Sequence, residues 1–345
     1  MKPDSRLVPE WVSGKGTDAD VVISTRTRLA RNLAAYPFPW RASEEVLNVV
    51  ARKVRAACAE LTTHIPGLKA CAVEKLTLVQ KSFLVDAHLA SAEQVSPGVG
   101  KLLVLEPSGV FSIMVNEEDH IRLQVIRSGL RLRETWEMAD WADDILSSRL
   151  DFAFSPQFGY LTAHVSNTGT GLRISALMHL AGLAKTGGLS RHLHAATGLA
   201  VAVRGVFGEA SRPAGDMYQV SNEITLGIPE TEIVERVRSV TEYLLCRERD
   251  ARNRLLESNR SRVLREAEAA LKCLSSAMSL GSGEALELIS RLRLACSLGL
   301  MPNCPLALTN ELLLAVQTVA GDDAVAKIER ARIMRERVKY GTSQM

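Results

Sequence analysis

A run of alternating apolar residues, Val110 to Val115, leads directly into three consecutive carboxylates, Glu117, Glu118 and Asp119. Alternation at a period of two predicts a β-strand, so the acidic residues lie at the end of a strand. Like charges this close repel one another, and a fold tolerates them when a cation or a bound substrate offsets the repulsion. A solvated acidic turn is the alternative, and it would be the simpler interpretation of an isolated Glu-Glu-Asp. The choice between a compensated acidic cluster and a solvated turn depends on the other motifs of the chain.

Composition restricts the classes of protein that this chain can belong to. Its 345 residues suffice for a large domain and a smaller one, and 46% hydrophobic residues provide a sizeable core. A net charge of +3 is too small to indicate nucleic-acid binding. The six cysteines form no CxxC pair, so neither a zinc site nor a redox motif is indicated, and we expect no metal site in the protein. There is no apolar signal segment and no run long enough to span a membrane. We expect a reduced, cytoplasmic protein with no nucleic-acid or membrane partner.

A second charged feature follows a short predicted strand, Asp20 to Ser24. Arg26 and Arg28 come directly after it, two positions apart. On an extended chain, residues at i and i+2 project from the same face, so the two guanidinium groups can clamp a polyphosphate. The alternative is a pair of exposed arginines on an edge strand.

A third feature is the glycine-containing stretch between Gly159 and Arg173. It reads as a strand, a turn and then a helix from Leu172 to Ala184. Backbone N–H groups at a helix start bind anions, and Arg173 would lie near that end. The stretch is neither a GxGxxG nor a Walker A sequence. A lone histidine, His164, precedes the turn, and such a histidine is more often structural than catalytic.

The remaining elements divide the chain into a mixed part and a helical part. From Pro229 a long helix begins, and everything after it reads as helical, with breaks near 281–283, 302–305 and 321. We expect a domain of residues 1–255 and a helical domain of residues 256–345, with a mobile loop at 208–217. Further strands are predicted at 76–85, 102–105, 121–126, 199–203 and 218–226, and helices at 44–61 and 132–150.

Five stretches together resemble the phosphagen (guanidino) kinase superfamily, and most closely the bacterial protein-arginine kinases of the McsB type. They are residues 24–33, 116–122, 167–173, 204–209 and 221–227. The resemblance implies an α+β fold, an antiparallel sheet flanked by helices, in a catalytic domain of residues 1–255. It also implies a C-terminal helical domain at 256–345. Only about twenty residues precede the first arginine pair, which is the McsB-like arrangement.

The resemblance also implies roles for particular residues. Two carboxylates, Glu118 and Glu209, would orient the acceptor guanidinium and relieve it of a proton as attack begins. Arginines around the polyphosphate would stabilise the charge on the phosphoryl group in transit. The residues implied to bind the nucleotide are Ser24, Arg26, Arg28, Arg122, Arg173 and Arg204.

His164 departs from the family pattern. The family usually has a cysteine followed by Pro-Thr-Asn where this chain has His164, Val165, Ser166 and Asn167. The family's thiolate pairs with the acceptor guanidinium, whereas a neutral imidazole accepts one hydrogen bond without negative charge. His164 is therefore a third candidate catalytic residue, with a space-filling role before the turn as the alternative.

The function implied is a protein-arginine kinase: ATP, with Mg²⁺ held through the nucleotide, and a protein arginine give ADP and phosphoarginine. One alternative is a small-molecule guanidino kinase acting on free arginine. Another is a catalytically weakened pseudokinase that binds phosphoarginine as an adaptor. The partners implied are proteins with an accessible arginine, an McsA-like activator, the Clp protease system of protein quality control, and a second copy in a homodimer.

Overall fold

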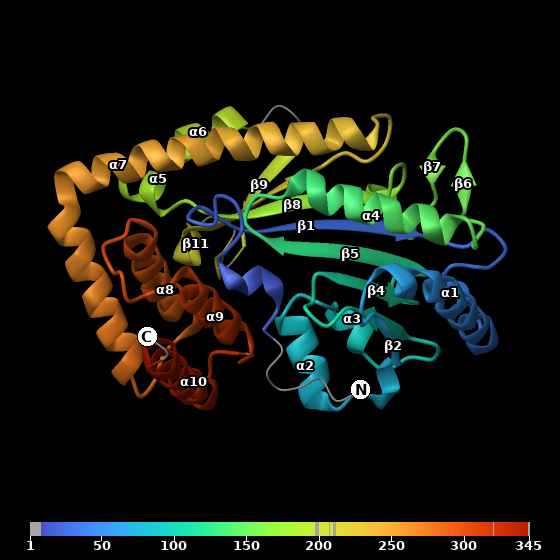
Figure 1. Cartoon of the computed structure of the whole chain (residues 1–345), viewed down its shortest axis with the longest axis horizontal. Coiled ribbons are helices and arrows are strands. Elements are labelled where there is room, and N and C mark those ends of the chain that lie inside the picture. The colour runs from blue at the N-terminus through green and yellow to red at the C-terminus, as the bar shows by residue number, and fades with distance from the viewer. Residues whose placement is uncertain (1–7, 197–199, 207, 210–211, 320, 344–345) are drawn as a thin grey trace.

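An eight-stranded antiparallel sheet forms the centre of the fold. The computed structural model describes residues 8–196, 200–206, 208–209, 212–319 and 321–343. The strand order of the sheet is β2-β3-β4-β5-β1-β8-β12-β9, so the first strand of the chain lies in the interior of the sheet (Figure 1). The strands are β1 (Val22–Arg31), β2 (Lys69–Ala72), β3 (Leu102–Leu105), β4 (Phe111–Val115), β5 (Ile121–Ser128), β8 (Leu172–His179), β9 (Val201–Gly205) and β12 (Met217–Asn222).

Helices cover both sides of this sheet, which confirms the predicted fold class. Two short hairpins, β6 (Phe154–Ser155) with β7 (Gly159–Tyr160) and β10 (Gly208–Glu209) with β11 (Arg212–Pro213), project from it. The helices are α1 (Glu44–His64), α2 (Leu78–Asp86), α3 (Ala92–Val95), α4 (Leu132–Ser147), α5 (Ala181–Lys185), α6 (Leu189–Ala196), α7 (Glu230–Ser276), α8 (Ser282–Ser297), α9 (Leu306–Gln317) and α10 (Ala324–Ser343).

One face of the sheet packs against α1, α4 and the first half of α7. Leu29 of β1 and Ile113 of β4 are fully buried there, in one core with Val54, Ala139 and Val237 of the three helices. Burial of apolar surface on this scale is the dominant favourable contribution to folding.

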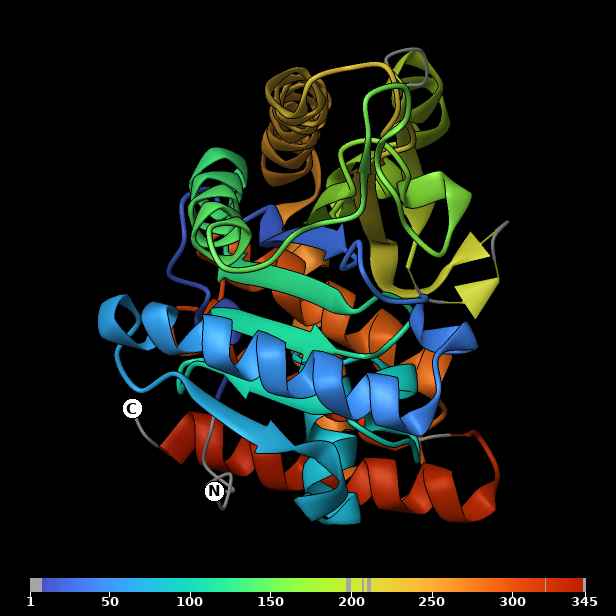
Figure 2. The same ribbon diagram turned by 90° about the vertical axis from the view of Figure 1, so that its right-hand side faces the viewer.

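The opposite face is shared between apolar and charged residues. Ile126 of β5 joins a second core formed with α8, α9, α10 and Trp11 of a 3₁₀-helix, η1 (Glu10–Ser13). In the view of Figure 2, α10 (red) lies at the bottom of the molecule, and α4 (green) and α7 (gold) lie at its top. Arg26 pairs in register with Ile126, so its side chain projects from the same face. The C-terminal helices thus complete the core beside the charged part of the sheet.

The strand predicted at 76–85 is wrong, because this segment is helical. Thr77 caps α2: its hydroxyl accepts from the backbone N–H of Gln80 at 3.3 Å, and the Gln80 amide oxygen accepts from the backbone N–H of Thr77 at 2.9 Å. This reciprocal pair is a capping box, and it starts a helix despite the apolar residues that follow. Leu78 and Val79 are 85% and 79% exposed, so their apolar character does not report a buried strand.

The helix predicted from Leu172 to Ala184 is also wrong. Residues Leu172–His179 form β8, between β1 and β12, and a helix begins only at Ala181. Leu172, Ile174, Ala176 and Met178 are fully buried at a spacing of two, which is the period of a strand. No helix begins near Arg173, so the helix start that was expected to bind an anion there is absent from the described residues.

Residue 255, the boundary expected from the sequence, lies inside α7. The backbone is non-helical at Asn259, with φ −138° and ψ 22°. The division of the chain at 255/256 stays a prediction. The predicted breaks after α7, α8 and α9 are confirmed. No helix in the described ranges is long and apolar enough to cross a membrane.

Candidate active site

Strand register brings the arginines of separate sequence motifs together on one face of the sheet. Arg28 of β1 lies directly opposite Arg173 of β8. On its other side Arg28 pairs with Gln124 of β5, two positions from Arg122. Arg26 projects from the same face, one strand repeat along β1. The antiparallel pairing thus assembles residues from three separate motifs.

The guanidinium groups lower one another's pKa values, because the positive charge of each makes the protonated form of its neighbours less favourable. Burial, and then Arg122 and Arg173, lower the pKa of Arg26 to about 10. Arg26, and then burial, hold the pKa of Arg28 well below its usual range. The Nε atom of Arg28 is buried and has no hydrogen-bond partner among the described residues. An anion with several acceptor oxygens would supply that partner and offset the repulsion, so the cluster fits a polyphosphate.

Arg122 is held in place by the acidic cluster. Its Nη1 donates to Glu117 Oε1 and its Nη2 to Glu118 Oε2, each at 2.7 Å. The hydroxyl of Ser91, the N-cap residue of α3, donates in turn to Glu117 Oε1. Two of the three consecutive carboxylates are therefore compensated by one cation, as expected for charges that a fold tolerates.

The third carboxylate, Asp119, has a structural role that the sequence did not separate from the other two. It is fully buried and accepts from Asn32 Nδ2 at 2.6 Å and from the backbone N–H of Ala163 at 2.7 Å. Burial raises the pKa of this carboxyl, and the two donors oppose that change. Asp119 thus ties the β4–β5 turn to the segment that carries His164.

His164 lies beside Glu118. Its Nε2 is 2.6 Å from Glu118 Oε1, the oxygen that Arg122 does not contact. The imidazole is 69% exposed, whereas the carboxylate side chain is 24% exposed. The imidazole is therefore open to solvent, whereas Glu118 Oε1 beneath it is buried and has no hydrogen-bond partner among the described residues.

A cavity of about 300 Å³ connects these groups. It is lined by Arg28, Leu29, Ala30, Arg122, His164, Ser166, Asn167, Gly171 and Arg173. Arg204 is 70% exposed, 3.4 Å from Glu223, and close enough to Arg173 to help lower the pKa of Arg173. Ser24 is buried on β1, opposite Ser128, and is not part of the lining. Arg28, Arg122, Arg173 and His164 therefore line the cavity, whereas Ser24, Arg26, Glu118 and Arg204 lie outside its immediate lining.

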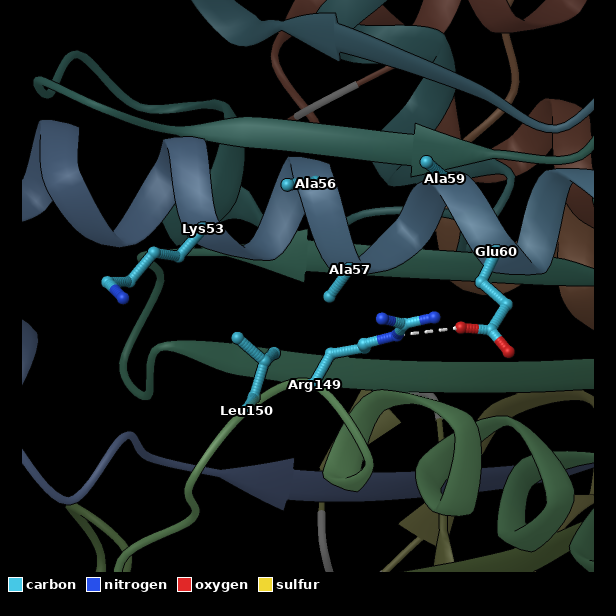
Figure 3. Close-up of a pocket in the computed structure, with 7 residues that line it drawn as sticks. All are labelled: Lys53, Ala56, Ala57, Ala59, Glu60, Arg149 and Leu150. Carbon is cyan, nitrogen blue, oxygen red and sulfur yellow. Dashed lines mark hydrogen bonds and ion pairs between the residues drawn. The ribbon is translucent and has the colours of Figure 1, made fainter.

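A larger hollow, of about 560 Å³, lies elsewhere, between α1 and the chain that follows α4. Figure 3 shows Arg149 bridging to Glu60 across it, at 2.9 Å, with Lys53 and Leu150 on its rim. Its wall includes Ala56, Ala57 and Ala59 and none of the candidate residues. Cavity size alone therefore does not identify the candidate site.

His88 is a site neighbour that sequence reasoning missed. Burial, and then Arg26 and Arg28, lower its pKa to about 4, so this imidazole is neutral beside the arginines. Its φ of 59° is in the left-handed region, and its carbonyl accepts from Gln124 Nε2 at 2.6 Å. A lone histidine between α2 and α3 offers no sequence signal, because only the fold brings it to the sheet.

Glu209, the second predicted carboxylate, lies in the β10–β11 hairpin, where it pairs with Arg212. Its side chain lies outside what the structure describes, as do residues 207, 210 and 211. The expectation of a mobile loop falls partly on those residues. Among the described residues, no group of three His, Cys, Asp or Glu side chains could hold a metal ion.

Comparison with known proteins agrees with this geometry. Residues 49–251 match the model of the ATP:guanido phosphotransferase C-terminal catalytic domain, and residues 260–344 match that of the protein-arginine kinase McsB C-terminal domain. The chain is 37% identical to the protein-arginine kinase of Halothermothrix orenii, over 91% of this chain and 89% of that protein. It is 41% identical to that of Moorella thermoacetica, over 89% of each. Among solved structures, lombricine kinase aligns with a TM-score of 0.60 and 24% identity over 74% of this chain and 71% of its own, which shows a shared fold.

Proposed function

This chain belongs to the ATP:guanido phosphotransferase family, and we propose that it phosphorylates arginine side chains of proteins at the cavity described above. The observation that carries the proposal is the convergence of Arg28, Arg122 and Arg173 on one cavity that His164 also lines, with Glu118 in contact with both Arg122 and His164. Its relatives named protein-arginine kinase match over most of its length, and the C-terminal match is to a domain of that kinase type.

The arginine cluster would bind the polyphosphate of ATP, with Mg²⁺ carried by the nucleotide. ATP supplies the γ-phosphoryl group, and transfer requires mainly that it be positioned and its charge stabilised. Arg28 and Arg173 face each other across β1 and β8, so the sheet itself fixes their separation. A guanidinium fork binds two phosphate oxygens at once, which orients the phosphate as well as neutralising it.

Glu118 would orient the acceptor guanidinium and accept its proton. A protonated guanidinium has no free lone pair, so a carboxylate must accept a proton as the nitrogen attacks. In the transfer, an N–P bond forms, the bond to the β-phosphate oxygen breaks, and the guanidinium proton passes to the carboxylate. Arg122 holds one oxygen of Glu118 at 2.7 Å, and His164 lies 2.6 Å from the other. The acceptor would compete with His164 for that oxygen.

That competition also favours a second candidate, a catalytically weakened kinase that serves as an adaptor. Both oxygens of Glu118 already contact groups of this chain. A kinase in which His164 does not move aside would retain nucleotide binding and lose turnover. A small-molecule guanidino kinase is the remaining alternative.

One experiment separates the three. The protein is incubated with MgATP and either unfolded casein or free L-arginine, and phosphoarginine is measured by mass spectrometry under non-acidic conditions, with Glu118→Gln as the control. Phosphoarginine in casein but not from free arginine supports the proposal. The reverse result identifies a small-molecule kinase, and nucleotide binding with neither product identifies the adaptor.

The remaining proposals concern assembly and setting. We propose that residues 256–345 act as one unit that governs acceptor choice or dimer formation, and that the protein works as a homodimer. An McsA-like activator and the Clp protease system are proposed partners, from the family resemblance. The described cysteines are all free thiols, which fits the proposed cytoplasmic setting. Light scattering on the full chain tests the dimer.

A further inference from the structure

A chain of buried polar groups connects α8 to the base of the hairpin that carries Glu209. The hairpin β10–β11 continues into a short 3₁₀-helix, η5 (Ala214–Asp216). Asp216 Oδ2 lies 2.8 Å from Ser290 Oγ of α8, and Ser290 Oγ lies 2.9 Å from His179 Nε2, at the end of β8. Arg252 Nη2 of α7 lies 3.3 Å from His179 Nδ1. His179, Arg252 and Ser290 are all at most 2% exposed.

The chemistry of its members fixes the direction of donation along this chain. A guanidinium can only donate, so His179 Nδ1 accepts from Arg252. The neutral imidazole then carries its proton on Nε2 and donates to Ser290 Oγ. Burial, with Arg252 and Arg293, holds the pKa of His179 well below its usual range, which agrees with a neutral ring. The Ser290 hydroxyl proton is left to donate to Asp216 Oδ2.

Further contacts fix η5 on α8. The backbone N–H of Gly215 donates to Glu287 Oε1 of α8 at 3.2 Å. On the other side, the Asp216 carbonyl accepts from the backbone N–H of Leu180, just before α5, at 2.9 Å. Gly215 has a φ of 72°, and a Cβ atom there would lie 2.9 Å from the carbonyl oxygen of Leu286. Glycine is therefore required for this close approach. The stem of the hairpin thus rests on one turn of α8.

We propose that Ser290 and Asp216 are positioning residues for phosphoryl transfer, through which α8 fixes the stem of the hairpin that carries Glu209. This inference rests on the proposed function, since it assigns Glu209 to the acceptor side. It gives the C-terminal helices a direct part in the catalytic geometry. Loss of one hydroxyl would leave the buried His179 N–H and the half-buried Asp216 Oδ2 without this partner, which favours a shifted stem.

The test compares Ser290→Ala with Thr309→Val. Thr309 of α9 is also fully buried, and its hydroxyl accepts from Arg293 at 3.0 Å and donates to the Leu306 carbonyl at 2.8 Å, so its hydrogen bonds do not involve η5. Both variants lose one buried hydroxyl, so both should lower the melting temperature. Only Ser290→Ala should lower kcat, by about tenfold to a hundredfold, because small displacements of catalytic groups have effects of that size. The Kd for the nucleotide should stay unchanged, and Asp216→Asn should reproduce the effect if Ser290→Ala fails to fold.

Hydrogen–deuterium exchange gives a readout that does not depend on activity. Backbone amides in residues 212–217 should exchange faster in Ser290→Ala than in the wild type or Thr309→Val. Equal exchange in all three proteins, or kcat losses that follow melting temperature alike in both variants, would overturn the proposal. A wild type that forms no phosphoarginine while the exchange result holds would instead refute the proposed function and leave the stem contact standing.

Discussion

The imidazole Nε2 of His164 lies 2.6 Å from Glu118 Oε1, and it meets the one oxygen of this carboxylate that Arg122 leaves free. The contact gives the histidine a defined partner, although most of its surface is exposed. The sequence alone left open whether His164 fills space before the turn. Its distance from Glu118 instead makes it a neighbour of the group proposed to accept the proton.

His164→Ala should raise kcat, by up to about tenfold, because it frees Glu118 Oε1, which lies 2.6 Å from the imidazole, for the acceptor guanidinium. Nucleotide affinity should be unchanged, since the arginine cluster is untouched. Initial rates with casein and calorimetric binding of ADP measure the two effects. His164→Cys serves as the comparison, because a thiolate restores a negative charge. Identical kcat values for all three proteins would return His164 to a space-filling role.

Glu118→Gln should reduce transfer by at least about a hundredfold, the lower range of general-base contributions, with nucleotide binding retained. Glutamine keeps the shape but cannot accept the proton, and Arg122 keeps its contact with Glu117. We expect the same direction for Glu209→Gln. Single-turnover rates and ADP titrations check this, and the assignment fails if affinity is lost while transfer survives.

Arg28→Ala should weaken nucleotide binding about tenfold to a hundredfold, which corresponds to about 1.5–3 kcal/mol for a charge-assisted contact. Arg28→Lys should recover only part of the loss, since an ammonium lacks the planar fork. Arg55→Ala is the matched control, because Arg55 is an exposed arginine on α1 that does not line the cavity. Equal ADP affinities for all four proteins would move the phosphate site elsewhere.

Ser91→Ala should lower kcat/KM by about threefold to tenfold, since Glu117 loses a charge-assisted partner and no longer fixes Arg122. Stability should also fall, by about 1 kcal/mol, because Ser91 caps α3 through the backbone N–H of Gln94. Urea unfolding and steady-state rates separate the two effects. Ser91→Thr keeps the hydroxyl and should restore both, and a variant that restores stability without activity would argue against the link to Arg122.

Stability should fall with acid through His120. Its Nδ1 accepts from the Leu33 N–H at 3.0 Å, and its Nε2 lies 3.1 Å from the Pro37 carbonyl, so the folded state requires the neutral ring. Burial lowers its pKa to about 4. The unfolded chain takes up the proton near pH ~6.5, so this contribution is complete above that pH. It falls by up to about 3 kcal/mol as the pH drops to 4.

Urea unfolding between pH 7 and pH 4.5 measures this loss. His120→Gln is the comparison, because its amide can accept from Leu33 and donate to Pro37 without titrating. The variant should show a shallower decline with acid. Parallel curves for the two proteins would assign the acid sensitivity to other groups.

The spacing of apolar residues and the pattern of charged residues predicted most of the helices and strands. The strands at 102–105, 110–115 and 121–126, the helix at 44–61 and the breaks between the C-terminal helices follow from local patterns, and the structure confirms them. The segment at 76–85 failed because Thr77 and Gln80 form a cap that outweighs apolar composition. The segment at 172–184 failed because a fully buried strand and a helix can have equally apolar sequences, and only pairing with β1 and β12 decides between them.

The residues of the site also divide into those that sequence motifs identify and those that only the folded structure reveals. Glu118 and the arginines could be identified because they occur in compact, recognisable motifs. His88 and Ser91 could not, since their link to Arg28 and Glu117 depends on how the segment before α3 packs on the sheet. The separate role of Asp119 also depends on Asn32, 87 positions away in sequence.

The interior position of β1 has a consequence for synthesis of the chain. The strand that carries Arg26 and Arg28 needs β5 on one side and β8 on the other, and β8 begins only at Leu172. At a translation rate of about 5–20 residues per second, β1 waits roughly 7–30 s for its second neighbour. Trp11 waits longer, for the C-terminal helices that cover it. A nascent or interrupted chain therefore exposes a basic, half-paired strand, and the arginine cluster can assemble only after β8 has been made.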